Sequence, residues 1–150
     1  MEELRWVRKF FNDLTPFELY DLIRLRNEVF VVEQNCVFQD ADNKDQFCFH
    51  LLGYIGNDLA AYARLVPTGV TYDGKISIGR VITSSAYRRS GSGRALMTEA
   101  IEQCYQIFGK QPIKIGAQLY LKDFYGSFGF IQTSEVYDED GIPHLEMIKD

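Results

Sequence analysis

Apolar positions recur along this chain with two different spacings, and the spacing predicts where strands and helices lie. Short runs that are apolar throughout, or that alternate apolar with polar residues, end at glycine, proline, asparagine or aspartate, as strands do. These runs predict seven strands, at residues 4–11, 47–55, 59–66, Ile76–Thr83, Ile113–Gln118, 131–137 and 144–148.

The first helix is predicted to begin at Thr15. A threonine N-cap, a proline at the first helical position (Pro16) and a glutamate that can close a capping box (Glu18) agree on this start. Apolar residues then recur at intervals of three and four, and the helix is expected to end near Val32. Residues 33–46 lose this pattern and are polar and acidic, which predicts a long loop with room for a short helix.

A second helix follows a glycine-containing segment, and a short third helix is predicted at residues 121–128. The second helix has an apolar face that ends at Gly109, a natural C-terminal stop. That face consists of Leu96, Met97, Ala100, Ile101, Cys104, Tyr105 and Phe108.

The order of these elements predicts a single α/β (α+β) domain over residues 1–150, built on a mixed sheet. Residues 56–58, with the sequence Gly-Asn-Asp, connect two strands as a hairpin, so part of the sheet is antiparallel. The strand–helix–strand unit through the second helix requires one parallel pair. We therefore expect a mostly antiparallel sheet of about seven strands, with helices on both faces.

The fourth predicted strand changes parity in its middle. Ile76 and Ile78 share one face, whereas Val81 and Thr83 continue the alternation on the other. One extra residue at Gly79 and its neighbour would restore the facing, which predicts a β-bulge. A glycine within a strand also marks close approach of a ligand to the backbone.

Charge and composition exclude several classes of protein. The net charge of −5 argues against broad nucleic-acid binding. No apolar run approaches the roughly 20 residues that span a membrane, and the N-terminal residues lack the layout of a signal peptide. Three scattered cysteines suit a reducing compartment, so we expect a cytoplasmic protein.

No metal site is expected. The three cysteines and two histidines lack the spacing of a zinc site. Residues 40–45 resemble the start of a calcium loop, but Lys44 stands at a ligand position, Asp45 replaces the glycine, and Leu51 replaces the final glutamate. Cys36 is interpreted as a small buried residue rather than a covalent nucleophile.

A loop rich in arginine and glycine precedes the second helix. Helix N-termini present unpaired N–H groups and favour anions, glycines let a ligand approach the backbone, and guanidinium groups fit phosphate. The segment therefore predicts a pyrophosphate site made by Arg88, Arg89, Gly91, Ser92, Gly93 and Arg94.

Residues 88–93, with the sequence Arg-Arg-Ser-Gly-Ser-Gly, fit the pattern [Q/R]-x-x-G-x-[G/A] of GNAT-type N-acetyltransferases. Residues 124–130 resemble the Y-x-x-x-G-F signature of that family. Further segments resemble its ElaA-like branch, namely residues 29–36, 40–42, 79–81 and 141–144. These matches occur in the expected order over nearly the whole chain.

The resemblance implies a sheet that splays apart between its fourth and fifth strands, with acetyl-CoA lying in the gap. The pyrophosphate would sit on the arginine–glycine loop, and the pantetheine arm would pair with the backbone of Val81, Ile82 and Thr83. Gln118 falls where many relatives carry asparagine, and with Phe124 it completes the implied cofactor site.

The implied activity is direct transfer of an acetyl group to an amine in a ternary complex. Tyr125 would protonate the departing CoA sulfur as general acid. A strand N–H near Val81 would stabilise the oxyanion. The alternative is a non-catalytic acyl-CoA-binding module on the same fold. A nucleotide binder unrelated to CoA is disfavoured because the P-loop and G-x-G-x-x-G patterns are absent.

The general base and the acceptor stay open. Glu33, His50 and His144 are candidate bases, beside a base acting through water, and each residue also has a purely structural interpretation. We also hypothesise that Glu33, Asp40 and Asp42 bind the positive charge of the acceptor, the alternative being a solvated loop. The acceptor would be a small-molecule or peptide amine, and a homodimeric assembly is left open.

Overall fold

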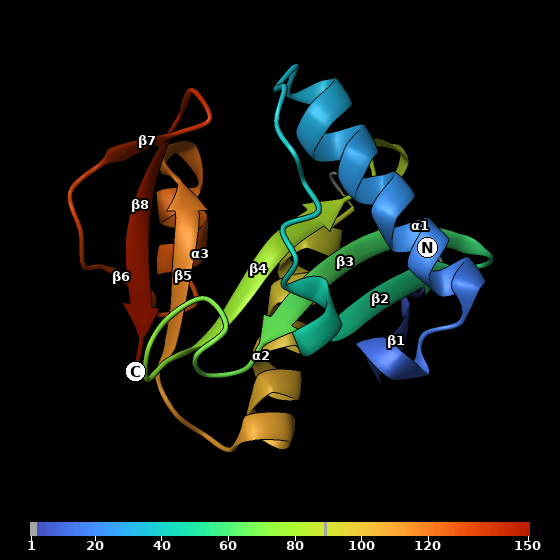
Figure 1. Cartoon of the computed structure of the whole chain (residues 1–150), viewed down its shortest axis with the longest axis horizontal. Coiled ribbons are helices and arrows are strands. Elements are labelled where there is room, and N and C mark those ends of the chain that lie inside the picture. Colours follow the sequence, from blue (N-terminus) through green and yellow to red (C-terminus); the bar gives the residue numbers. More distant parts are fainter. Residues whose placement is uncertain (1–2, 89) are drawn as a thin grey trace.

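The computed structural model describes residues 3–88 and 90–150, and its centre is one mixed sheet (Figure 1). The strands are β1 (Arg5–Phe10), β2 (Phe49–Ile55), β3 (Asp58–Val66), β4 (Ile76–Thr83), β5 (Ile113–Gln118), β6 (Ile131–Gln132), β7 (Tyr137–Glu139) and β8 (Ile142–Lys149). The helices are α1 (Pro16–Arg26), α2 (Ser92–Phe108) and α3 (Lys122–Gly126), with shorter helical segments η1 (Phe11–Asp13), η2 (Asn27–Glu33), η3 (Asp45–Phe47), η4 (Ser85–Tyr87) and η5 (Leu119–Leu121).

The strand order confirms the predicted mixed α/β fold. The strands lie in the order β1-β2-β3-β4-β5-β8-β6, and β7 extends the pairing on β8. The β4–β5 pair is parallel, whereas every other pairing in the described residues is antiparallel. Helices α1 and α2 lie on opposite faces of the sheet (Figure 1). Each face therefore has its own core, one packed beneath α2 and one beneath α1.

Both long helices begin as their sequences predict. The Thr15 side chain accepts a hydrogen bond from the Glu18 N–H, and the Glu18 carboxylate accepts one from the Thr15 N–H, which closes the capping box. After α1 the chain continues as a wider π-helical turn, η2, to Glu33. Gly91, with φ of 81°, precedes α2, and the Gly109 N–H ends that helix on the Tyr105 carbonyl.

The predicted strand 131–137 is wrong, because it divides into β6 and β7. Ile131 pairs with Ile148 and Tyr137 with His144, so the two pieces lie at opposite ends of β8. Between them the Ser134 hydroxyl accepts a hydrogen bond from the Glu146 N–H, a position that a strand carbonyl would otherwise fill. Side-chain hydrogen bonding of this kind competes with the ladder.

The splay between β4 and β5 is the feature that positions the site. The two strands pair at two registers, Ile76 with Ile113 and Ser77 with Lys114, and the described residues show no further pairing between them. Figure 1 shows the strands diverging beyond this point. The backbone of β4 after Ser77 therefore has a strand partner on its β3 side only, within the described part of the chain.

Candidate functional site

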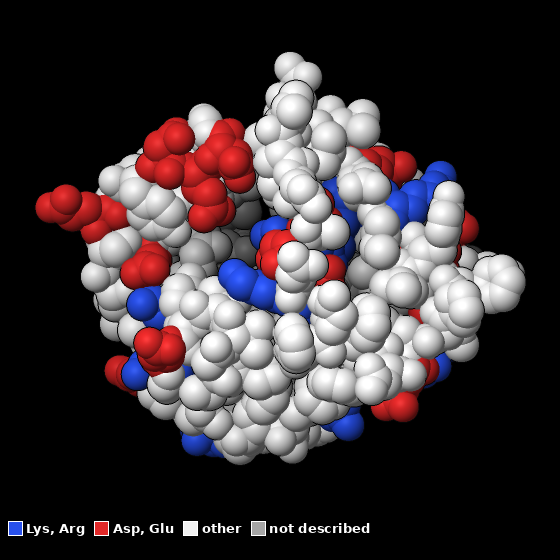
Figure 2. All heavy atoms as spheres, in the orientation of Figure 1, with Lys and Arg blue, Asp and Glu red and all other residues white. Residues whose placement is uncertain are grey.

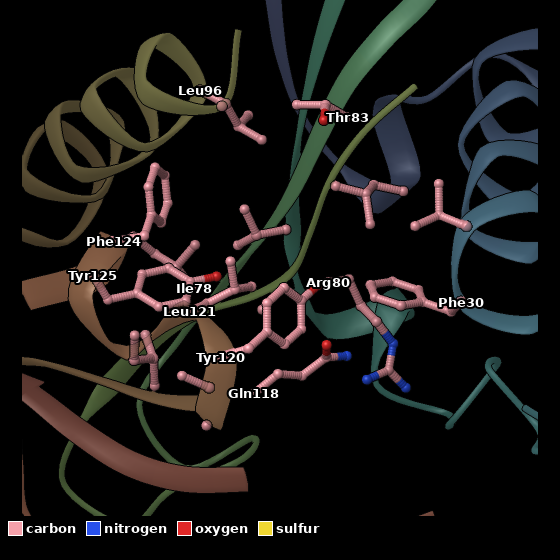
Figure 3. A pocket seen from close by; sticks show the side chains of 18 of the residues that line it. Phe30, Ile78, Arg80, Thr83, Leu96, Gln118, Tyr120, Leu121, Phe124 and Tyr125 are labelled. Carbon is pink, nitrogen blue, oxygen red and sulfur yellow. The ribbon is translucent and has the colours of Figure 1, made fainter. Parts of the chain in front are cut away.

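A cavity of about 530 Å³ lies between the diverging strands (Figure 3). Its walls come from η2, β4, the start of α2, β5 and the helical turns that follow β5. The lining includes Phe30, Glu33, Gln34, Arg80, Val81, Ile82, Thr83, Arg88, Gly93, Gln118, Tyr120, Phe124 and Tyr125. Most residues that the sequence assigned to the cofactor therefore meet around one slot.

The predicted bulge in β4 is present at this cavity. Arg64 of β3 is opposite Gly79 whereas Tyr62 is opposite Ile82, so β4 carries one extra residue between the two pairs. Arg80 occupies that place with φ of 49°, a left-handed conformation that is uncommon outside glycine. The bulge turns the last residues of β4 relative to its first ones, and these last residues line the cavity.

A network of buried arginines and aspartates holds the bulge from behind. Arg26 lies 2.7 Å from Asp40 and from Asp45 through its Nε and Nη1 atoms. Arg64 binds Asp42 with both of its Nη atoms, at 2.8 and 2.9 Å. Arg80 reaches Asp40 through Nε at 2.9 Å. Three elements, α1, β3 and β4, are therefore joined through the single loop that follows η2.

This network changes the interpretation of Asp40 and Asp42. Asp40 is 6% exposed, and its carboxylate already faces two of the chain's own guanidinium groups. Burial acts to raise the pKa of Asp42, but hydrogen bonds and charge from Arg64, with the charge of Arg80, outweigh it and lower the pKa to about 2. Of the three acidic residues expected at the acceptor, Glu33 is the one that lines the main cavity.

The arginine–glycine loop lies at the other end of β4. Gly91 has the left-handed backbone predicted for it, and Gly93 lines the cavity in the first turn of α2. The Ser92 hydroxyl donates to the Tyr87 carbonyl at 3.0 Å, which ties the loop to the start of the helix. Arg94 donates to the Ser127 hydroxyl at 2.9 Å and lies over the Phe128 ring. Arg89, also predicted here, lies outside the described residues.

Arg88 bridges the two sides of the slot. Its Nη2 atom lies 2.6 Å from Glu33 Oε1 of η2. The same guanidinium donates twice to the Thr83 carbonyl, from Nε at 3.2 Å and from Nη2 at 3.0 Å. The last carbonyl of β4 and the end of η2 are thus linked through one side chain.

Tyr125 approaches the cavity from α3. Its ring meets the rings of Phe124 and Phe130 edge to face, and Figure 3 shows its hydroxyl pointing into the cavity. Burial raises the pKa of Tyr125, so the hydroxyl stays protonated at neutral pH. Among the described residues nothing hydrogen-bonds to it, which leaves its proton available to a bound molecule.

Gln118 and Gln34, which both line the cavity, face each other. The Nε2 atom of each amide lies 3.4 Å from the Oε1 atom of the other. Gln34 directly follows Glu33, one of the candidate bases, and belongs to the segment 29–36 that carries the resemblance, yet the resemblance assigns a site role to neither Gln34 nor Tyr120. No local pattern could have paired Gln34 with Gln118, because the two residues are 84 positions apart along the chain.

The two histidines lie outside the main cavity. His50 is fully buried, with Nδ1 2.6 Å from the Tyr62 hydroxyl and Nε2 2.9 Å from the Asp45 carbonyl. Burial lowers the pKa of His50, opposed in part by the Asp45 carbonyl. His144 places Nδ1 2.7 Å from the Ile142 carbonyl and Nε2 3.4 Å from Glu139. Neither ring lies among the residues that line the slot.

A second cavity of about 310 Å³ adjoins the first and shares Phe30, Gln34, Arg80 and Gln118 with it. The exposed acidic residues Glu139 and Asp140 of the β7–β8 hairpin stand at its rim, and Figure 2 shows acidic side chains gathered over this part of the molecule. Cys36 is buried in its wall, with its thiol 3.3 Å from the Asp140 carbonyl.

Among the described residues, no group of three or more histidine, cysteine, aspartate or glutamate side chains is arranged to hold a metal ion. No helix in residues 3–88 and 90–150 is long and apolar enough to cross a membrane.

Comparison with known proteins identifies the family. Residues 26–150 match the family described as an acetyltransferase (GNAT) domain. ElaA of Escherichia coli is 42% identical over 149 residues, which are 98% of this chain and 97% of that protein. Its crystal structure matches with a TM-score of 0.91 at 41% identity, over 98% of this chain and 99% of that one.

Two further structures extend the comparison. An acyl-CoA N-acyltransferase from Pseudomonas aeruginosa matches with a TM-score of 0.93 and 42% identity, over 98% of this chain and 99% of that one. A Bacillus subtilis acetyltransferase, solved in complex with CoA, has a TM-score of 0.66 and 21% identity over 99% of both chains, and so shares the fold. The family match over residues 26–150 and the similarity over nearly the full length agree: the chain belongs to the GNAT acetyltransferase family and resembles ElaA over nearly its whole length.

Proposed function

We propose that this protein transfers the acetyl group of acetyl-CoA directly to an amine, with both substrates bound at once. The observation that carries the proposal is the arrangement of three features along one cavity. These are the N-terminus of α2, the backbone of β4 beyond its last pairing with β5, and the Tyr125 hydroxyl. The CoA bound to the Bacillus subtilis acetyltransferase of the same fold supports CoA as the ligand class.

The cofactor would lie along the slot with its diphosphate at α2. The N–H groups that follow Gly91, together with Arg88 and Arg94, provide donors and positive charge for it. The pantetheine arm would pair with the backbone of β4 between Val81 and Thr83, where the structure leaves the β5 side open. A thin extended arm satisfies backbone groups that would otherwise need another strand.

Transfer forms a nitrogen–carbon bond and breaks the carbon–sulfur bond of the thioester. The neutral amine attacks the carbonyl carbon, and an N–H near Val81 stabilises the oxyanion. As the tetrahedral intermediate collapses, the sulfur leaves with the electron pair and takes the proton of Tyr125. The amine, now acetylated, gives up its extra proton to the base.

The raised pKa of Tyr125 is compatible with this role because burial also disfavours a free thiolate. A CoA thiolate that forms in the slot loses its hydration as the Tyr125 phenolate would, so both proton affinities rise together and Tyr125 can share its proton with the leaving sulfur. Glu33, which lines the cavity, is our choice for the base, acting directly or through water.

The test compares Tyr125→Phe with Tyr120→Phe, a second tyrosine that lines the same cavity. We expect Tyr125→Phe to lower kcat by about 100-fold or more, the usual scale of general acid catalysis. The Kd for acetyl-CoA, measured by calorimetry, should stay within about twofold of wild type. Thiol release is followed with a panel of diamines, amino sugars and lysine peptides.

Two results would count against the proposal. A wild-type protein that binds acetyl-CoA but releases no thiol with any amine would favour the non-catalytic module. Equal turnover by the Tyr125→Phe and wild-type proteins would remove Tyr125 from the mechanism while leaving the transferase assignment intact.

A further inference from the structure

The contacts of Arg88 involve groups that CoA would also need. If the proposed function holds, the diphosphate at α2 requires the Arg88 guanidinium, and the pantetheine arm requires the Thr83 carbonyl. In the structure that guanidinium donates to the Thr83 carbonyl through two nitrogens and pairs with Glu33 at 2.6 Å. The Arg88 side chain therefore binds the Thr83 carbonyl, which the pantetheine arm would need, and the Glu33 carboxylate at the same time.

We infer that Glu33 and the CoA diphosphate compete for Arg88, so that binding of the cofactor releases the Glu33 carboxylate into the cavity. The inference rests on the proposed function, and it assigns to Glu33 a state that depends on the cofactor. While paired with Arg88, Glu33 is a poor ligand for a cationic amine, because a guanidinium already neutralises the charge of its carboxylate. Once released, it is an unpaired carboxylate beside the thioester.

The exchange is physically inexpensive. The side chains of Arg88 and Glu33 are 39% and 28% exposed, and ion pairs of that kind contribute little to stability. A diphosphate offers Arg88 more negative charge and bidentate geometry, next to a helix N-terminus that already favours anions. The Glu33 pair should therefore give way to CoA and weaken its binding only slightly.

The neighbouring contacts show why Glu33 itself stays in place when Arg88 turns away. It ends η2, which continues directly from α1, and the next residue, Gln34, is held by the amide of Gln118. The carboxylate is thus carried by a segment anchored on both sides of it. Arg88, by contrast, is a long and partly exposed side chain on the loop between η4 and α2, so it is the partner that can turn towards a diphosphate.

The test measures CoA affinity by calorimetry for wild type, Glu33→Gln, Arg88→Gln and the double variant. Because Glu33→Gln removes the competitor, we expect CoA to bind about two- to fivefold tighter, the range set by an exposed ion pair. In the Arg88→Gln background the same change should have no effect. Glu28→Gln, on the same segment η2 and outside the cavity lining, is the matched control for loss of one negative charge.

Dephospho-CoA keeps the diphosphate and lacks the 3′-phosphate, so Glu33→Gln should tighten its binding by the same factor. Weaker CoA binding by Glu33→Gln would overturn the inference, because Glu33 would then be orienting Arg88 for the cofactor. An equal gain with and without Arg88 would also overturn it, since the effect would be simple charge repulsion. If wild type binds no CoA, the proposed function itself fails; if wild type binds CoA and Glu33→Gln changes nothing, only the competition fails.

Discussion

Two groups of arginines flank β4, and they differ in almost everything except residue type. Arg26 and Arg64 lie beneath its bulge and are almost fully buried, Arg80 forms the bulge itself, and aspartates surround all three guanidinium groups. Arg88 and Arg94 lie beyond its end, where their partners are an exposed glutamate, a backbone carbonyl and a serine hydroxyl. Aspartate carboxylates compensate the charge of the first group within the fold. The guanidinium groups of the second group are exposed enough to bind a charged ligand.

The difference shows how arginine side chains can provide both rigid internal contacts and contacts that exchange their partners. Desolvated ion pairs are costly to break, so the inner group fixes the left-handed residue in β4 and the backbone that follows it. Exposed pairs exchange partners at little cost, so the outer group can serve a charged molecule. Variants of the inner group should therefore lose stability, and variants of the outer group should lose affinity for CoA.

The largest effect is expected for Asp40→Ala. This change leaves Arg26 buried without one of its two carboxylates and deprives Arg80 of its Nε partner. Removing one member of a buried ion pair costs about 3–5 kcal/mol, and the free energy of unfolding in urea should fall by that amount. Asp73→Ala, in an exposed turn, is the control and should change stability by less than about 0.5 kcal/mol. If Asp40→Ala leaves the free energy of unfolding unchanged, the inner arginine–aspartate network does not stabilise the fold.

A smaller effect is expected when the pH falls. The pKa of Asp42 is about 2 in the folded protein and 3.8 for an unperturbed aspartate, so the unfolded chain binds this proton first. The stabilisation from Asp42 is therefore complete above about pH 4 and is lost as the pH falls towards 2, by about 2 kcal/mol in all. Urea unfolding at pH 5 and pH 2.5 measures it. Asp42→Asn should lose less stability than wild type over that interval, and an equal loss would place the dependence elsewhere.

The smallest effect, and the one that separates the groups, is expected for Arg94→Gln. The Kd for CoA should rise about three- to tenfold, the scale of one charge-assisted hydrogen bond. The free energy of unfolding should stay within about 0.5 kcal/mol of wild type because Arg94 is exposed. Arg24→Gln on α1 serves as the control for a lost positive charge. A large loss of stability with unchanged CoA binding would assign Arg94 to the inner group instead.

Local signals in the sequence predicted much of this architecture. The capping box at Thr15, the glycine before α2 and the bulge at Gly79 each depend on a few adjacent residues, and each is present. The sequence failed where side chains override the ladder, as at Ser134, which divides one predicted strand in two.

The candidate site was predictable to the same extent. Residues on β4 and at the start of α2 are marked by their own patterns. The partners of Asp40 are not, since Arg26 and Arg80 are 14 and 40 residues away along the chain. The pair of Glu33 with Arg88 spans 55 residues, and nothing near either residue announces it. Which arginines neutralise an acidic loop is decided only when the chain folds. The sequence of residues 33–46 taken by itself therefore resembles a ligand site.

Because β4 and β5 pair at only two registers among the residues that the structure describes, each strand keeps an unpaired edge, and such edges bear on how a protein avoids aggregation. Unpaired strand edges usually invite a neighbouring polypeptide, and proteins protect them with charges, bends or covering segments. Here two such edges face each other across the cavity that Phe30 and Tyr120 also line. Both edges lie in the interior of the strand order and not at its margins, so the molecule that enters this cavity is the one that meets their unpaired backbone groups.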